Sequence, residues 1–108
     1  MGDTLLQRIP VVAGLAYIER VRRLPPELTV TLHAERENRY FLHAIAVMAN
    51  GEKVGYVAPE VSRRYHAPML AHAGALTCPA RRASKWDDQT SGVELVLDFT
   101  ALPVEPAA

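Results

Sequence analysis

A chain of 108 residues, 49% of them hydrophobic, is long enough to fold as one domain around its own core. Twelve basic residues balance twelve acidic ones, which excludes a strong overall positive field, so any site for a polyanion has to be a local feature. A single cysteine excludes an internal disulfide and a four-cysteine zinc site, and this cysteine usage leads us to expect a cytoplasmic protein.

The first third of the chain predicts two strands joined by a basic loop. Residues 11–18 are mostly apolar with a glycine inside, as in a buried strand that bends. Residues 19–27 contain three arginines and then two adjacent prolines, which cannot continue a sheet ladder, so we predict a connecting loop. Residues 28–35 alternate strictly between apolar and polar side chains, which predicts a half-buried strand.

A hairpin is predicted in the middle of the chain. Residues 44–49 and 53–58 are apolar runs of strand length, and Asn50-Gly51 lies between them. An Asn-Gly pair is typical of the two-residue turns whose backbone twist suits a hairpin. We therefore predict two antiparallel strands joined by a tight turn.

A helix is predicted directly after this hairpin. Pro59 suits the first helical turn, and apolar residues recur at helical spacing until Gly74 ends the run. Pro68 lies inside the run, where it has no N–H to donate and its ring clashes with the preceding turn. The sequence therefore predicts either a kink at this proline or two short helices.

Two closing strands complete the pattern, at residues 76–82 and 93–99, with a polar loop over residues 84–92 between them. Several short strands with one helical insertion predict a mainly β fold, a small closed or nearly closed barrel of about six strands with one or two short helices. We expect a lead-in, one domain and a disordered tail, at residues 1–9, 10–101 and 102–108.

The most specific motif of the chain lies between residues 32 and 56. It runs as an acidic residue, Asn, Tyr, Ala-Ile, a strand, a turn and Gly-Tyr, carried by Glu37, Asn38, Tyr40, Ala44, Ile45, Val47, Gly51, Val54, Gly55 and Tyr56. This pattern resembles the HIRAN domain. Gly14 and Tyr17 upstream, and Pro59-Glu60 downstream, fall in the order of that family.

The resemblance implies an OB-like barrel that is found alone in bacteria and is fused to helicase-type ATPases elsewhere. It also implies binding of single-stranded DNA, with the terminal 3′ hydroxyl and its base held in a pocket. The nucleic-acid-binding residues that it implies are Tyr17, Asn38, Arg39, Tyr40, Phe41, His43 and Tyr56, with Arg20, Arg22 and Arg23 as candidate phosphate contacts.

Three positions of the motif differ from the family pattern. Phe41 stands where the family has the acidic residue that faces the terminal hydroxyl, and an apolar ring accepts no hydrogen bond there. Arg39 replaces a proline and offers a phosphate contact, and His43 replaces an asparagine. Whether a free 3′ end is required therefore stays open.

Each of these residues also has a structural interpretation. The rings of Tyr17, Tyr40 and Tyr56 either stack on bases, at about 1–3 kcal/mol per base, or pack in the core. Asn38 either contacts the nucleic acid or shapes its loop through an Asx-turn. The arginines at positions 20, 22 and 23 either contact phosphates or form a solvated face.

The sequence predicts no catalysis, no metal and no cofactor. The four histidines lack the spacing of metal ligands, and Cys78 lies in a predicted strand, where it is interpreted as a core residue. A GxxxxGK phosphate loop is missing from the sequence, so we do not expect an ATPase. Residues 1–12 resemble neither a signal peptide nor a membrane span.

The partners that we expect are single-stranded DNA or DNA strand ends, with a helicase or repair protein to supply any activity, and no membrane. The corresponding function is a DNA-binding module in repair or replication-fork processing. The alternative is a protein-interaction module on the same barrel that has lost the DNA pocket.

Overall fold

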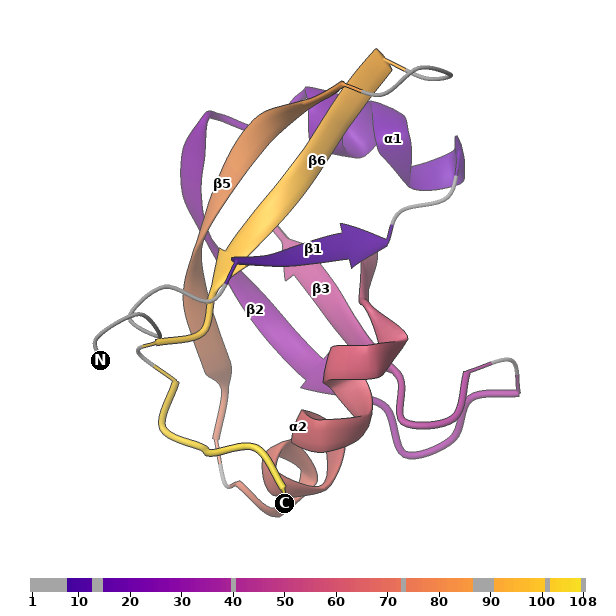
Figure 1. The fold of residues 1–108 in the computed structure, drawn as a ribbon, viewed down its shortest axis with the longest axis vertical. Coiled ribbons are helices and arrows are strands. Elements are labelled where there is room, and N and C mark those ends of the chain that lie inside the picture. The colour runs from indigo at the N-terminus through magenta and orange to yellow at the C-terminus, as the bar shows by residue number, and fades with distance from the viewer. Residues whose placement is uncertain are drawn as a thin grey trace.

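A computed structural model describes residues 8–12, 15–39, 41–72, 74–86, 91–100 and 102–107. Six strands within these residues form a closed OB-like barrel with the neighbour order β1-β4-β3-β2-β5-β6, and every pair is antiparallel (Figure 1). The strands are β1 (Arg8–Val12), β2 (Glu27–Ala34), β3 (Ile45–Ala49), β4 (Glu52–Val57), β5 (Leu76–Trp86) and β6 (Ser91–Asp98), and the helices are α1 (Leu15–Arg22) and α2 (Pro59–Ala71). The predicted fold class is confirmed.

The strand predicted over residues 11–18 and the loop predicted over 19–27 are wrong in part. Of the described residues in these two segments, 11–12 belong to β1, 15–22 form α1 across the boundary that we predicted, and Glu27 begins β2. Apolar residues at positions 15, 18, 21 and 24 recur at every third position, which suits one face of a helix. Val21 is 2% exposed, so this face is buried at the end of the helix. A short apolar run does not distinguish a strand from a buried helix, and this ambiguity caused the error.

The predicted hairpin is confirmed. β3 and β4 pair antiparallel, and both turn residues have left-handed backbone angles, with φ of 53° at Asn50 and 81° at Gly51. Two consecutive left-handed residues are what a type I′ turn requires, and Asn and Gly adopt this conformation at little cost. The turn therefore explains why these two strands meet in this register.

The predicted helix forms as one element, α2, and passes through Pro68, so two separate helices are not formed. Because Pro68 has no N–H, it cannot donate to the carbonyl of Arg64, four residues earlier. The N–H of Ala107 donates to that carbonyl instead, over 2.7 Å. Leu102 and Val104, within the expected tail, are partly buried against the core. Residues 102–107 thus return to α2 (Figure 1).

The closing strands pair as predicted but are longer than expected. β5 and β6 include residues 84–86 and 91–92 of the predicted loop, and residues 87–90 lie outside the described part of the chain. β5 pairs with β2 through its first half and with β6 through its second half. One long strand therefore carries the sheet from one side of the barrel to the other (Figure 1).

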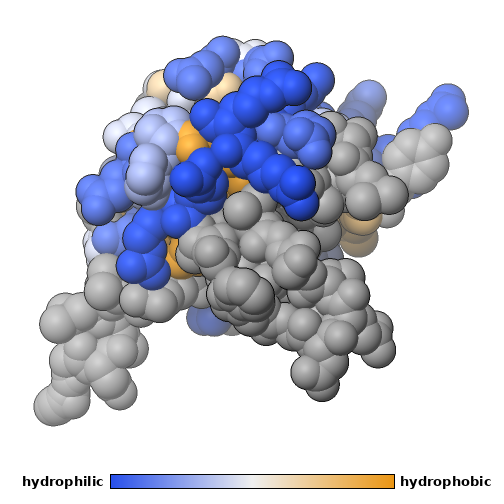
Figure 2. All heavy atoms as spheres, turned by 90° about the horizontal axis from the view of Figure 1, so that it is seen from above, coloured by the Kyte–Doolittle hydropathy of each residue, from blue (hydrophilic) through white to orange (hydrophobic). Residues whose placement is uncertain are grey.

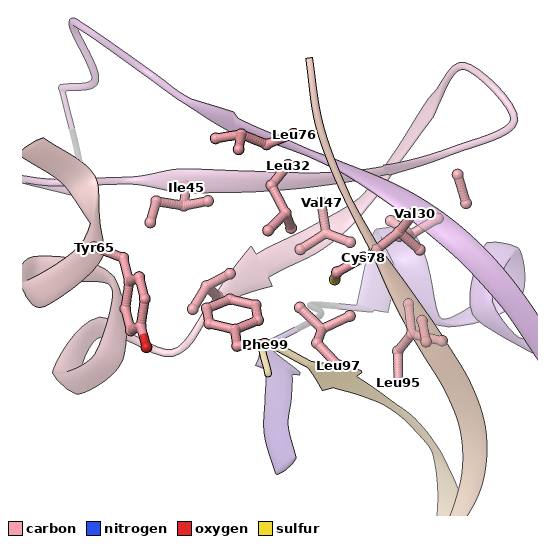
Figure 3. Packing of buried hydrophobic residues seen from close by; sticks show 14 of the residues in the cluster. Val30, Leu32, Ile45, Val47, Tyr65, Leu76, Cys78, Leu95, Leu97 and Phe99 are labelled. Carbon is pink, nitrogen blue, oxygen red and sulfur yellow. The ribbon is translucent and has the colours of Figure 1, made fainter. Parts of the chain in front are cut away.

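The core lies inside the barrel and is covered at one end by α2. The ring of Tyr65, on α2, packs edge-on against Phe99, with centroids 5.0 Å apart, and Figure 3 shows this pair beside the strand residues. Cys78 is 2% exposed among them, which confirms its interpretation as a core residue. The most deeply buried strand residues are Val30, Ile45, Val47, Val54, Leu95 and Leu97.

Burial raises the pKa of the Cys78 thiol to about 12. Because the thiolate is the reactive form, we expect iodoacetamide at pH 8 to modify Cys78 about 1,000-fold more slowly in the native protein than in guanidinium chloride. Mass spectrometry of quenched time points measures both rates. Equal rates in the two conditions would show that the thiol is accessible in the folded chain.

The side chain of Arg82, on β5, closes the C-terminal end of α1. Its guanidinium donates to the carbonyl of Arg22 over 2.7 Å and to that of Leu24 over 2.8 Å. Arg22 is the last residue of α1, so its carbonyl is one that the helix leaves unpaired, and a positive charge is favourable there; Leu24 lies in the turn that follows.

We expect Arg82→Gln to lower the free energy of unfolding by about 1–2 kcal/mol, because two charge-assisted hydrogen bonds are lost at a partly exposed position. Arg81→Gln is the matched control, since Arg81 is exposed and is the preceding residue of the same strand. Its effect should stay within about 0.5 kcal/mol. Urea denaturation followed by circular dichroism measures both, and equal effects would contradict the capping role.

Candidate nucleic-acid interface

Four side chains form a continuous hydrogen-bonded network where the loop between β2 and β3 meets β4. The carboxylate of Glu35 accepts from Asn38 Nδ2 over 2.7 Å and from Lys53 Nζ over 3.0 Å. Lys53 Nζ also donates to the hydroxyl of Tyr56 over 2.8 Å and lies 4.8 Å from the centre of its ring. Asn38 Oδ1 accepts from the backbone N–H of Phe41 over 2.9 Å. We call Glu35, Asn38, Lys53 and Tyr56 the carboxylate network.

The ion pair in this network is only partly exposed, with 18% of the Glu35 side chain and 28% of the Lys53 side chain accessible. Burial acts to raise the pKa of the Glu35 carboxyl, but hydrogen bonds from Asn38 and Lys53, with the Lys53 charge, hold that pKa below its usual value. The Tyr56 hydroxyl and the Glu35 carboxylate raise the pKa of Lys53 against the effect of burial. Both members of the pair are therefore charged at neutral pH.

An irregularity in β4 places Lys53 and Tyr56 on the same face. Residues three apart in a regular strand point to opposite faces. In β4, Val47 pairs with Gly55 and Met48 with Lys53, so Val54 has no partner of its own and forms a β-bulge. The extra residue shifts the alternation, as bulges do, and both polar side chains leave the core while Val54 stays buried.

An apolar rim lies next to this network. Phe41 is 48% exposed, and its ring lies 5.4 Å from that of Tyr56 at an angle of 45°. Leu42 is 84% exposed. A cavity of about 190 Å³ opens beside them and is lined by Phe41, Leu42, Ala44, Tyr56, Val57, Pro59 and Ser62. The rim therefore offers ring faces and an apolar recess within reach of the Lys53 charge.

Two wide depressions of about 530 Å³ share the loop residues 35–39. The first is completed by His33, Lys53 and Tyr56, and the second by Phe41, Leu42, His43 and His66. Arg36 and Arg39 line both and are exposed. The loop thus presents two guanidinium groups, which suit phosphate contacts, beside the rings of the apolar rim.

The model of the HIRAN domain family matches residues 10–97 of this chain. The chain belongs to the HIRAN family. HIRAN domains are nucleic-acid-binding modules, so binding of nucleic acid is the general function of the family to which this domain belongs. Neither the search of the curated proteins nor that of the solved structures found a match. No helix in the described part of this HIRAN domain is long and apolar enough to span a membrane.

Helix α1 brings two of the predicted residues to the network of this HIRAN domain. Arg20 donates from its guanidinium to the backbone carbonyl of Lys53 over 2.8 Å, and it lies over the ring of Tyr17 at 5.6 Å. Arg22, in the same last turn of α1, and Arg23, directly after the helix, are exposed, and Arg82 of β5 binds the carbonyl of Arg22. The three predicted arginines therefore lie together at the C-terminal end of α1, and the side chain of Arg20 contacts β4.

The end of the barrel at which α1 lies is largely hydrophilic over the described residues (Figure 2). Arg22 forms an exposed ion pair with Glu19 at 3.8 Å, which contributes little to stability. Phosphate contact by Arg22 and Arg23 stays a prediction. Tyr40, at the centre of the predicted motif, lies outside the described residues.

The loop of this HIRAN domain is fixed by its own side chains. Asn38 bonds both to Glu35 and to the backbone N–H of Phe41, so its side chain shapes the loop, while contact of Asn38 with nucleic acid stays a prediction. His43 has a left-handed backbone angle, φ 65°, at the position where the family has asparagine, a residue that favours this conformation. Its ring packs edge-on against His66 of α2, with centroids 5.4 Å apart.

Several residues of the site were not predicted from the sequence, among them Glu35, Arg36, Leu42, Lys53 and His66. His66 is 7% exposed and donates from Nε2 to the carbonyl of Glu35 over 2.6 Å, which ties the loop to α2. Its position among the helical residues gave no sign of this contact, since His66 and Glu35 are 31 residues apart. Among the described residues, no three His, Cys, Asp or Glu side chains are grouped so that they could hold a metal ion.

Proposed function

We propose that this HIRAN domain binds single-stranded DNA along the loop between β2 and β3. The observation that carries the proposal is the position of the Phe41 and Tyr56 rings, 5.4 Å apart beside the ammonium group of Lys53. Bases of a single strand stack on aromatic rings regardless of sequence, while cations along a groove follow its phosphates. The exposed guanidinium groups of Arg36 and Arg39 extend this path.

In this proposal the domain binds the DNA strand, and a partner in the cytoplasm, such as a helicase or a repair protein, carries out the reaction on it. The corresponding process is DNA repair or the processing of replication forks. The most specific part of the proposal concerns the 3′ end of the strand. Phe41 occupies the position of the hydroxyl-facing acid of the family, so a free 3′ hydroxyl should add little to affinity.

Fluorescence anisotropy with a labelled 12-nucleotide strand tests the proposal. Strands with a free or a phosphorylated 3′ end, a duplex and an RNA of the same sequence are compared over a range of salt concentrations. We expect the single DNA strand to bind more tightly than the duplex, with a log-log salt slope of about −0.7 for each phosphate contact. Absence of binding at low salt would overturn the proposal. A strong preference for the free 3′ end would show that the domain recognises the terminal hydroxyl although Phe41 replaces the acidic residue.

The exposure of Phe41 and Leu42 favours a second candidate function, a protein-interaction module that uses the apolar rim. Large exposed apolar side chains beside a recess are typical of protein contacts. Capture of partners from a nuclease-treated lysate by the wild-type domain, compared with Leu42→Ser, distinguishes the two functions. A partner protein captured by the wild-type domain and not by Leu42→Ser, together with no binding of DNA to the domain, would support the second function against the first.

A further inference from the structure

We infer that Lys53 is a phosphate-binding residue of this site and that the carboxylate of Glu35 competes with the DNA phosphate for it. This inference rests on the proposed function and assigns a residue to it. Neither Lys53 nor Glu35 belongs to the set of binding residues that the sequence indicated.

The ammonium group of Lys53 has three donors, and two of them are used by Glu35 Oε2 and the Tyr56 hydroxyl. The group lies in an open depression with Arg36 and Arg39, where an approaching strand passes. The Tyr56 hydroxyl holds the ammonium group of Lys53 next to the ring of Tyr56 itself, on which a base can stack. A phosphate that follows a stacked base therefore arrives at an ammonium group that already has a carboxylate partner.

A carboxylate and a phosphate present the same kind of acceptor to an ammonium group, an anionic oxygen at about 2.7–2.9 Å. Glu35 uses its two oxygens separately, Oε1 for Asn38 and Oε2 for Lys53. When Lys53 turns to a phosphate, the bond between Glu35 and Asn38 remains. The exchange replaces one anionic partner of Lys53 by another, so the ammonium group keeps a charge-assisted hydrogen bond.

The loop does not depend on the charge of Glu35 for its position. The backbone N–H of Glu35 donates to the carbonyl of Ala44 over 2.9 Å, and its carbonyl accepts from His66 over 2.6 Å. A glutamine at position 35 keeps an oxygen for Asn38 and has nearly the same shape. Glu35→Gln therefore removes the competing charge and leaves the loop in place.

The test compares four variants by anisotropy with the same 12-nucleotide DNA strand. Glu35→Gln should tighten binding about 3- to 10-fold at low salt, and Lys53→Gln should weaken it and reduce the salt slope by about 0.7. Glu37→Gln is the matched control, because Glu37 is an exposed carboxylate that lines the same depression. It should have less than half the effect of Glu35→Gln on the logarithm of affinity.

The double variant Glu35→Gln/Lys53→Gln decides whether the effect of Glu35 passes through Lys53. If it does, Glu35→Gln gains nothing in the Lys53→Gln background, since there is no ammonium group left to release. An equal gain in both backgrounds means general repulsion of DNA and overturns the inference. Weaker binding by Glu35→Gln also overturns it. Thermal unfolding confirms that each variant is folded before its affinity is compared.

Failure of the inference and failure of the proposed function give different results. A wild-type domain that does not bind the strand refutes the function itself. A wild-type domain that binds, with Lys53→Gln unchanged in affinity and salt slope, refutes only the role of Lys53. An NMR titration of the wild-type protein with inorganic phosphate adds a direct probe, because the side-chain signals of Lys53 should shift as phosphate is added, and unchanged signals would contradict the role of Lys53.

Discussion

Replacing Leu97 with alanine is expected to lower the free energy of unfolding by about 2–5 kcal/mol. Leu97 is 0% exposed and lies in β6, where its register partners are Ile9 of β1 and Ala80 of β5 (Figure 3). Truncation leaves a cavity that the closed barrel cannot collapse into without shifting strands on both sides. A loss of this size is a large part of the 5–15 kcal/mol that stabilises a typical domain.

Leu42→Ala is the control for this prediction, because it makes the same chemical change at a residue that is 84% exposed. Its effect should stay within about 0.5 kcal/mol. Urea denaturation followed by far-UV circular dichroism gives both values, and an unchanged dependence on urea shows that the unfolded states are comparable. Similar losses in the two variants would contradict the placement of Leu97 in the core.

Replacing Tyr56 with alanine is expected to weaken binding of single-stranded DNA by about 5- to 150-fold, which corresponds to about 1–3 kcal/mol for one stacked base. The variant removes a ring face that pairs with Phe41 and also removes the hydroxyl that holds Lys53. Anisotropy at one fixed salt concentration measures the change. Retained affinity would show that the strand does not pass over this ring.

Two further tyrosine variants distinguish loss of the Tyr56 ring from loss of its hydroxyl and from destabilisation of the fold. Tyr56→Phe keeps the ring and loses only the hydroxyl, so it should weaken binding less than about 5-fold. Tyr65→Phe alters a tyrosine that is 5% exposed and packs on Phe99 in the core, and it should leave DNA affinity unchanged. Equal losses in Tyr56→Phe and Tyr65→Phe would point to destabilisation of the fold as the cause.

Most of the barrel was predictable because its strands have clear local patterns. β2 alternates apolar and polar residues over its whole length, and the Asn50-Gly51 pair determines the hairpin that follows. Helix α1 was missed because its apolar residues form a short run that also suits a strand. The ends of β5 and β6 were missed because pairing between neighbouring strands extends them through polar residues.

Residues of the site that belong to the sequence motif were predicted, whereas residues that only the fold brings to the site were missed. The motif indicated Asn38, Phe41 and Tyr56, which the structure brings together. Lys53 was missed because regular alternation places it on the face opposite to Tyr56, and only the bulge reverses this. Gly55, a glycine inside a strand, was the one local sign of that bulge.

Closure of the barrel limits how a partner can dock on this domain. β1 pairs with both β4 and β6, so each of the six described strands has two neighbours along at least part of its length. A partner peptide that adds a strand can then pair only along stretches with one described neighbour, such as residues 91–95 of β6, and less edge is open to aggregation than in an open sheet. Association over the rest of the barrel uses surface side chains, where single substitutions can abolish it and leave the barrel intact.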